Sequence, residues 1–189
     1  MLSSAQKKSL LQLARNAIAA LWSGESATAE NVPELRELSP RFVGVFVSLR
    51  VSEKLRGCIG NLTNAAPLPE LVIEMAQAAA SHDPRFAPLR LEELHEVEIE
   101  ISLLHPMAPL RSPNEIVIGR DGLMVRLGKK HGLLLPQVAT QRGWDAPTFL
   151  QHVCRKADLP LEAWKNSKAE VFRFRAEVFS DHAGESSEP

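Results

Sequence analysis

Cysteine is scarce in this sequence, and the metal-binding residue types are widely spaced. Only two cysteines, Cys58 and Cys154, occur among the 189 residues. Two isolated thiols do not make a disulfide framework, and they lack the CxxC spacing of a zinc or redox motif. The six histidines form no HxxxH or HExxH pair. The spacing therefore predicts no metal site, and nothing in the sequence identifies a cofactor.

The sequence also lacks long apolar runs and has almost no net charge. No apolar stretch approaches the ~20 residues of a membrane-spanning helix, and the N-terminus lacks the compact apolar segment of a signal peptide. The formal net charge is −1, so no global field would attract nucleic acid or a membrane surface. We therefore expect a cytoplasmic protein that binds no membrane, and the charge disfavours nucleic-acid binding, although a local basic patch would still allow it.

What the sequence does contain is an irregular alternation of helical and strand-like segments. Helical spacing predicts helices over 4–22 and 66–82, and Asp83-Pro84 ends the second. Strand patterns cover four segments: 42–51, 55–60, 96–104 and 169–179. The first two are predicted to form a hairpin. Strand pairs joined by short turns favour an α+β fold with antiparallel sheets layered with helices over a doubly wound parallel sheet.

Residues 114–160 read as a compact block of two strands followed by two helices. Asp121-Gly122 is predicted to form a hairpin turn, and Asp145 to cap a helix that runs to about Ala157. We predict a single domain over 1–180, built as a larger two-layer sandwich with this smaller α+β subdomain inserted. The last residues, 181–189, are predicted to be a disordered tail.

The motif LRGCIG, at 55–60, carries one of the two thiols between glycines. Strand alternation predicts that Arg56 and Cys58 share a face, and a positive charge beside a thiol favours the nucleophilic thiolate. We therefore name Cys58 and Arg56 as candidate catalytic residues, and Gly57 and Gly60 as candidate substrate-binding residues. The alternative is a structural one, because a free cysteine commonly serves as a small buried hydrophobe.

Three further residues complete the candidate substrate-binding set. Asp83 and Arg85, in HDPRF, would present a carboxylate and a guanidinium on a turn for a polar ligand; alternatively, they only satisfy local backbone groups. His131 lies at a predicted strand entrance, although a lone histidine is commonly structural or solvated. Cys154 is not part of this set, because it has the helical spacing of a core residue.

Several of these motifs together are similar to a known family. LRGCIG, DPRF, GLLLPQVA, and GWD followed by FLQHVCRKA, in this order, resemble the AMMECR family, which includes protein A of the AmmeMemoRadiSam system. The resemblance covers nearly the whole chain. It implies two α+β parts, the larger holding both chain ends, with LRGCIG near a cleft between them. The system's other members resemble a Memo-type, dioxygenase-like protein and a radical-SAM enzyme, which implies a shared redox or modification pathway.

Two positions depart from the family pattern, which has a glutamate where this chain has Gln141 and a glycine where it has Asp158. A glutamine cannot act as a base, so no catalytic role is expected at Gln141. Asp158 follows a predicted helix, where aspartate tolerates the left-handed conformation better than most residues.

The sequence leaves three functions open and does not decide whether the protein is an enzyme. The first is an enzyme, or an enzyme component, that acts on an unknown small molecule in a cleft around Cys58. The second is a non-catalytic scaffold for the Memo-type or radical-SAM partner, with the glycines of LRGCIG admitting the partner's backbone. The third is RNA binding, which the net charge disfavours.

Overall fold

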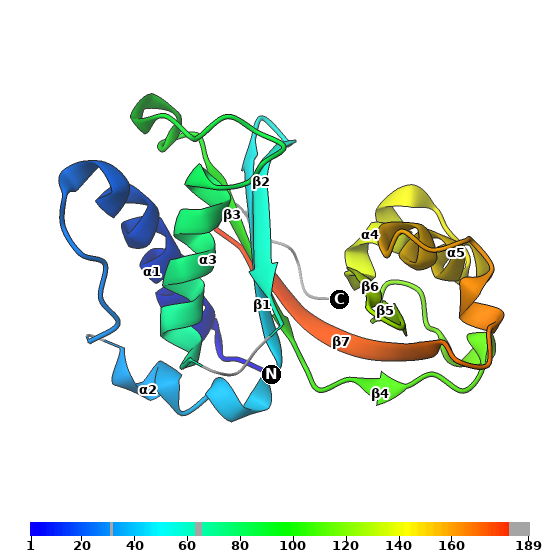
Figure 1. The fold of residues 1–189 in the computed structure, drawn as a ribbon. Helices are drawn as coiled ribbons and strands as arrows, with labels where there is room; N and C mark the ends of the chain where they lie inside the picture. The colour runs from blue at the N-terminus through cyan, green and yellow to red at the C-terminus, as the bar shows by residue number, and fades with distance from the viewer. Residues whose placement is uncertain (31, 63–65, 182–189) are drawn as a thin grey trace. The chain divides into compact units, whose positions relative to one another are not determined.

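The structure, a computed structural model, describes residues 1–30, 32–62 and 66–181. Helices and antiparallel strands make the predicted α+β fold (Figure 1). The helices and strands are α1 (Ser4–Ser23), α2 (Pro33–Arg36), β1 (Gly44–Val51), β2 (Lys54–Asn61), α3 (Leu68–Ser81), β3 (Glu98–Leu104), β4 (Ala108–Pro109), β5 (Asp121–Leu127), β6 (Lys130–Leu134), α4 (Pro136–Arg142), α5 (Ala146–Lys156) and β7 (Glu170–Ser180).

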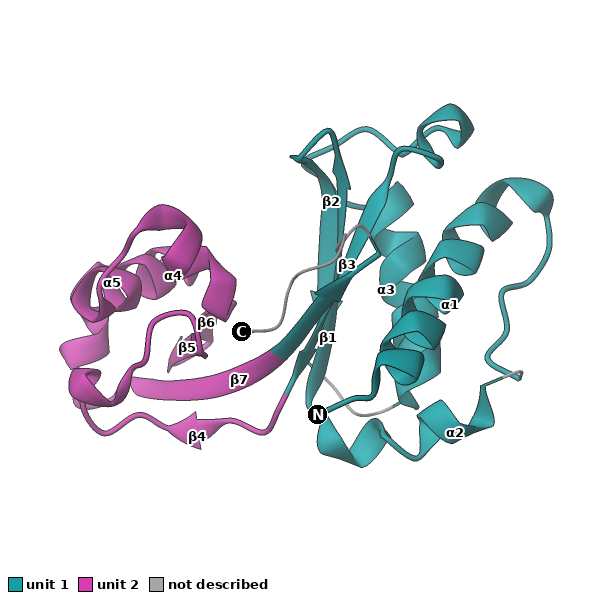
Figure 2. Ribbon diagram, turned by 180° about the vertical axis from the view of Figure 1, so that it is seen from behind, with its two compact units in different colours: residues 1–104, 177–189 teal, residues 105–176 magenta. Residues whose placement is uncertain are grey.

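The chain divides into two compact units (Figure 2). Each unit has its own hydrophobic core. Unit 1 comprises Met1–Leu104 and Glu177–Pro189, and unit 2 comprises His105–Ala176. Unit 2 begins before and ends after the segment 114–160 singled out in the sequence, because β4 pairs with the first half of β7. That a single domain spans 1–180 stays a prediction.

The sheet of unit 1 has the strand order β2-β1-β3, followed by the end of β7. The predicted hairpin is confirmed: β1 and β2 pair antiparallel through a turn at Ser52 and Glu53. Both turn residues have positive φ, 48° and 63°, as a type I′ two-residue hairpin turn requires. β2 therefore lies at one edge of this sheet.

Two helices cover one face of the unit 1 sheet (Figure 1). Ser3 caps α1 by accepting a hydrogen bond from the Gln6 backbone N–H, and the Gln6 side chain accepts one from Ser3. The helices bury apolar stripes against inward-facing residues of β1: Leu10, Ala14 and Ala17 of α1, Leu71, Met75 and Ala79 of α3, and Val45, Val47 and Leu49 of β1. Ser48 and Arg50, which alternate with these residues along β1, thus lie on the opposite face.

Unit 2 repeats this plan on a smaller scale, with α4 and α5 packed against β5 and β6. Asp145 caps α5 as predicted, because its carboxylate accepts the Thr148 N–H at 2.9 Å. Asp158, just after α5, has φ 55°. Asp158 thus adopts the left-handed conformation that aspartate was expected to tolerate at this position.

The prediction of a hairpin turn at Asp121-Gly122 is wrong. β5 begins at Asp121, and the turn between β5 and β6 falls at Gly128-Lys129 instead. The Asp121 side chain is buried and accepts a hydrogen bond from the Val117 backbone N–H at 3.0 Å. The local turn signal was therefore outweighed by a buried polar contact that closes the preceding turn.

The end of β7 leads into the segment predicted to be disordered. Its first residue, Asp181, is described: its carboxylate accepts hydrogen bonds from Arg15 and from the Ile99 backbone N–H. Residues 182–189 lie outside the described residues. Across the described part of the chain, no helix is both long and apolar enough to cross a membrane.

Candidate functional site

A β-bulge in β2 lies next to the thiol of LRGCIG. Leu49 of β1 pairs with Gly57, whereas the adjacent Arg50 pairs with Leu55. Arg56 is therefore an extra residue with no partner of its own on β1. A bulge shifts the register by one residue and changes which side chains of the two strands share a face.

The shifted register brings Cys58 opposite Ser48. The Ser48 hydroxyl donates a hydrogen bond to the Cys58 Sγ at 3.3 Å, so both side chains lie on the sheet face away from the helices. Cys58 is partly exposed, whereas Ser48 is buried. Cys58 is therefore a partly accessible thiol with a hydroxyl donor beside it.

The backbone of Cys58 is held on the outer edge of β2 by the DPRF turn. The Cys58 N–H donates to Asp83 Oδ2 at 2.8 Å, and the Cys58 carbonyl oxygen accepts from Arg85 Nη2 at 3.1 Å. An edge strand leaves such groups without a neighbouring strand. Here one aspartate and one arginine satisfy both groups at the thiol-bearing residue.

Asp83 and Arg85 also bind each other. Arg85 Nε donates to Asp83 Oδ1 at 2.9 Å, Nη2 donates to Oδ2 at 2.7 Å, and the Arg85 backbone N–H donates to Oδ1 at 3.1 Å. The hydrogen bonds from Arg85 and from the Cys58 N–H hold the pKa of Asp83 well below its usual range, against the opposing effect of burial. Asp83 stays ionised, and its accepting capacity is used within the protein.

The Arg85 guanidinium is the positive charge that lies at the thiol. Its hydrogen bond to Asp83 raises its pKa, and the Cys58 side chain adds to this increase. The guanidinium also lies 5.2 Å from the centroid of the Phe86 ring. The Arg85 side chain is half exposed, so it faces solvent beside the partly exposed thiol.

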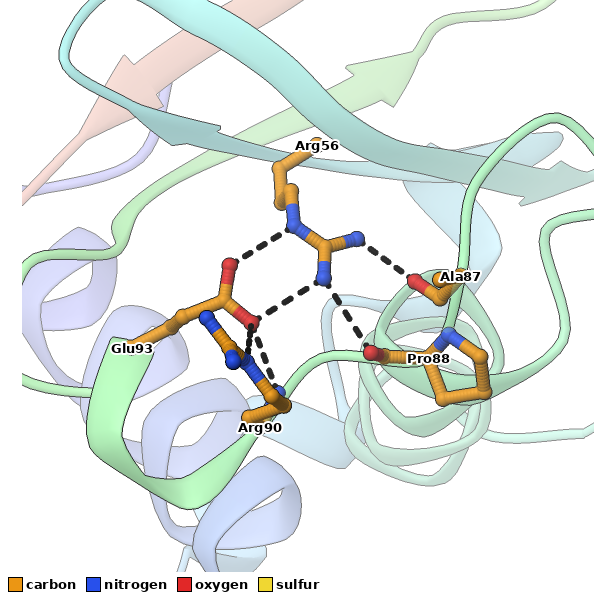
Figure 3. A network of polar contacts seen from close by, with 5 residues as sticks. All are labelled: Arg56, Ala87, Pro88, Arg90 and Glu93. Carbon is orange, nitrogen blue, oxygen red and sulfur yellow. Dashed lines mark hydrogen bonds and ion pairs between the residues drawn. The ribbon is translucent and has the colours of Figure 1, made fainter.

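Arg56, the predicted tuning residue of Cys58, is engaged elsewhere (Figure 3). Its Nε and Nη2 donate to the two carboxylate oxygens of Glu93 at 2.8 and 3.0 Å. Nη1 donates to the Ala87 carbonyl oxygen at 2.6 Å, and Nη2 to that of Pro88 at 3.1 Å. Every nitrogen of this guanidinium is thus bound to the segment that follows α3. A direct effect of Arg56 on the thiol stays a prediction.

The glycines of LRGCIG lie where the protein itself fills the adjacent space. A Cβ on Gly57 would overlap the backbone carbonyl of Ala79 in α3, and one on Gly60 would overlap the ring of Phe46. Gly57 therefore allows β2 to approach α3 closely. That either glycine contacts a ligand stays a prediction.

The remaining candidates lie in unit 2. His131 is an exposed residue of β6, opposite Arg126 of β5, and its ligand-binding role is untested. Cys154 is fully buried in the unit 2 core, as its spacing predicted. Burial raises the pKa of the Cys154 thiol.

Two residues of this region, Ser48 and Glu93, were not predicted from the sequence. Ser48 is paired with Cys58 only because of the bulge at Arg56, and hairpin register without a bulge would have placed it opposite Gly57. Glu93 lies in a short 3-10 helix, Leu91–Glu93, and its contact with Arg56 spans 37 positions. No local sequence signal reveals either contact.

The chemistry that this arrangement supports is that of a thiol. Over residues 1–30, 32–62 and 66–181, no group of three or more histidine, cysteine, aspartate or glutamate side chains is arranged to hold a metal ion. A partly exposed thiol with a hydroxyl donor and a guanidinium beside it has the surroundings in which nucleophilic cysteines are usually found.

Comparisons with known proteins agree with this architecture. The family model AMMECR1 matches residues 11–179. A protein of Methanothermobacter thermautotrophicus is 40% identical over 186 residues, which cover 95% of this chain and 96% of that protein. A protein of Thermococcus gammatolerans is 45% identical over 159 residues, which cover 79% and 76% of the two chains.

A solved structure is also similar to this chain. It is the crystal structure of an uncharacterised protein from Pyrococcus horikoshii, which is 38% identical and covers 96% of this chain and 94% of its own, with a TM-score of 0.87. The shared fold and the family match over nearly the whole length agree with the resemblance seen in the motifs. The chain therefore belongs to the AMMECR1 family.

Proposed function

We propose that this protein is an enzyme, or a component of one, in which the Cys58 thiol is the reacting group. The observation that carries the proposal is the surroundings of Cys58 Sγ. The thiol is partly exposed and accepts a hydrogen bond from Ser48, and the Arg85 guanidinium lies beside it. Structural cysteines are usually buried among apolar side chains, whereas reactive ones lie in electropositive, accessible places.

The residues around the thiol have separate roles in this proposal. Asp83 and Arg85 fix the backbone of β2 on both sides of the Cys58 peptide, so the sulfur is held in place. Ser48 directs a hydroxyl donor at the sulfur. The thiolate would attack an electrophilic carbon and form an S–C bond, while the leaving group departs with the bonding electrons and the thiol proton passes to water.

The pathway and partners of this activity are proposed from the family resemblance. The other members of the AmmeMemoRadiSam system, a Memo-type protein and a radical-SAM enzyme, would supply or consume the molecule that reacts at Cys58. The alternative, a non-catalytic scaffold, relied on open space beside Gly57 and Gly60. It has less support, because Ala79 and Phe46 occupy that space.

Selective alkylation tests the proposal. The native protein is treated with iodoacetamide, and the modified cysteines are identified by peptide mass spectrometry. We expect Cys58 to react at least about 100-fold faster than Cys154, and faster than N-acetylcysteine at the same pH.

Substitutions separate activation of the thiol from simple exposure. Ser48→Ala is expected to slow the alkylation of Cys58 several-fold, whereas Ser167→Ala, at an exposed position of unit 2, should leave it unchanged. If both cysteines react only after the protein is unfolded, the proposal is wrong.

A further inference from the structure

Arg85 has a fixed orientation beside the thiol and one edge that the protein does not use. Its Nε and Nη2 donate to Asp83, and Nη2 also donates to the Cys58 carbonyl oxygen. These contacts use the Nε–H group and both Nη2–H groups. Among the described residues, no hydrogen-bond partner accepts from Nη1, and we call the two Nη1–H groups the free edge. A guanidinium held by Nε and Nη2 is pre-organised to donate from Nη1 to an oxyanion.

A molecule arriving from solvent would meet the positive member of the Asp83–Arg85 pair. The Arg85 side chain is 51% exposed, whereas that of Asp83 is 2% exposed. The pair is neutral as a whole, so it exerts little force at long range. At contact distance, however, the exposed N–H groups of Arg85 can form charge-assisted hydrogen bonds.

The other charged residue in register with the thiol lies on the far side of Ser48. Glu100 of β3 pairs with Ser48, and Ser48 pairs with Cys58, so the three residues form a row across three strands. Arg85 reaches Cys58 from the opposite side, at the outer edge of β2, where it donates to the Cys58 carbonyl oxygen. An anion that approaches the thiol from this edge would therefore meet the Arg85 guanidinium.

The segment 83–93, which carries Arg85, is attached to β2 at both ends. Asp83 holds one end at Cys58. At the other end, Arg56 binds the Glu93 carboxylate, and it also donates to the Ala87 and Pro88 carbonyl oxygens in the middle of the segment (Figure 3). We call the Arg56–Glu93 ion pair the clamp. Glu93 also accepts the Arg90 backbone N–H at 2.9 Å. The clamp therefore fixes the end of the segment 83–93 against β2.

The clamp is ionised over a wide pH range. Hydrogen bonds from Arg56 lower the pKa of Glu93 from 4.5 to about 2, although burial acts in the opposite direction. The side chains of Arg56 and Glu93 are 20% and 17% exposed. Solvent thus screens this pair less than an exposed ion pair.

From these contacts we propose that the Cys58 site takes an anionic substrate, whose carboxylate or phosphate group binds the free edge of Arg85. Glu93 is a positioning residue for this recognition, because it holds the segment that keeps Arg85 at the thiol. The inference rests on the proposed function, since it treats Cys58 as the reacting group. In this proposal Arg56 affects the site indirectly, because it binds Glu93 and so holds the segment 83–93.

Two alkylating reagents that differ in charge test this proposal. Iodoacetate and iodoacetamide both form an S–C bond with a thiolate and release iodide, and the thiol proton passes to solvent. The quantity measured is the rate constant for iodoacetate at Cys58 divided by that for iodoacetamide, each relative to N-acetylcysteine. We expect this ratio to be about five or more, because a guanidinium near the sulfur attracts the carboxylate of iodoacetate.

Variants separate the parts of the proposal. Arg85→Gln should return the ratio to about one, and Glu93→Gln should lower it at least about twofold. Glu170→Gln, which breaks an Arg–Glu pair in unit 2, should leave the ratio as in the native protein. Arg56→Lys keeps a charge but loses the two-pronged contact with Glu93. Arg56→Lys should lower the ratio as Glu93→Gln does. If Cys154 becomes reactive in Glu93→Gln, that variant is no longer properly folded, and Arg56→Lys is used in its place.

The outcomes distinguish this inference from the proposed function. If native Cys58 reacts with neither reagent, the proposed function is overturned. If it reacts but the ratio is the same after Arg85→Gln, the anionic substrate is overturned and the thiol chemistry stands. If the clamp variants keep the native ratio with Cys154 still protected, Glu93 has no positioning role.

Discussion

Cys58 and Cys154 lie near similar strand–helix contacts but in different chemical surroundings. In unit 1, Gly57 lets β2 approach α3, and the neighbouring Cys58 lies on the opposite, polar face with Ser48. In unit 2, Gly132 lets β6 approach the end of α5, and Cys154 of α5 is fully buried in the core. Each unit thus carries one thiol close to such a contact, and the face that it occupies decides whether it is partly exposed or buried.

The largest expected effect comes from filling these strand–helix contacts. Gly57→Ala should lower the free energy of unfolding by more than about 3 kcal/mol, because the new Cβ overlaps a backbone carbonyl in the last turns of α3. Gly132→Ala should cost less, about 2 kcal/mol, because its Cβ meets the backbone just beyond the last residue of α5, where the chain can shift.

Urea unfolding followed by circular dichroism measures both glycine variants. A Gly57→Ala protein as stable as the native one would contradict the close approach of β2 to α3. It would also restore the idea that this glycine leaves room for a ligand or partner.

Serine substitutions sharpen the comparison between the two thiols. Cys154→Ser should cost about 1–3 kcal/mol, because it places a hydroxyl in an apolar core. Cys58→Ser should change stability by less than about 0.5 kcal/mol, because the site is already polar and partly exposed. Thermal and urea unfolding of the two variants check this, and equal losses would mean that Cys58 is also a core residue.

A moderate effect and a small one are expected at two Arg–Glu pairs of different exposure. Glu93→Gln should lower the free energy of unfolding at neutral pH by about 1–2 kcal/mol, because Arg56 is partly buried and loses a charged partner. Glu170→Gln should have little effect, because the Arg126–Glu170 pair lies in solvent.

The pH dependence of the Glu93 effect has a definite sign. The pKa of Glu93 is lowered from 4.5 to about 2 in the folded protein, so the folded state favours the ionised form. The stabilisation is therefore present above about pH 4.5 and is lost as the pH falls towards 2. Unfolding measured between these values should show the native protein and Glu93→Gln converging, and a constant difference would rule out the ion pair as the cause.

The sequence predicted the elements that local signals define. The hairpin of β1 and β2, the helix over 66–82 that ends before Asp83-Pro84, and the Asp145 cap each follow from residues within a few positions. The buried character of Cys154 followed from helical spacing alone.

The contacts around Cys58 could not be predicted in the same way. Strand alternation assumes a regular ladder, and the bulge at Arg56 interrupts it. The arginine that lies at the thiol is Arg85, from a turn 27 positions away, rather than the nearby Arg56. The predicted hairpin turn at Asp121-Gly122 was wrong for a related reason, since burial of the Asp121 carboxylate outweighed the local preference of Asp-Gly for a turn.

Strand β7 has a consequence for the modularity of the chain. Its first residues belong to unit 2 and its last to unit 1, and the chain leaves unit 1 only between Leu104 and His105 and returns between Ala176 and Glu177. These exit and entry points are adjacent, because the His105 N–H donates to the Arg175 carbonyl oxygen at 2.9 Å. Unit 2 is thus inserted in the sequence between the two parts of unit 1. We expect that a short reverse turn joining Leu104 to Glu177 would connect the two parts of unit 1 directly in a chain that lacks unit 2.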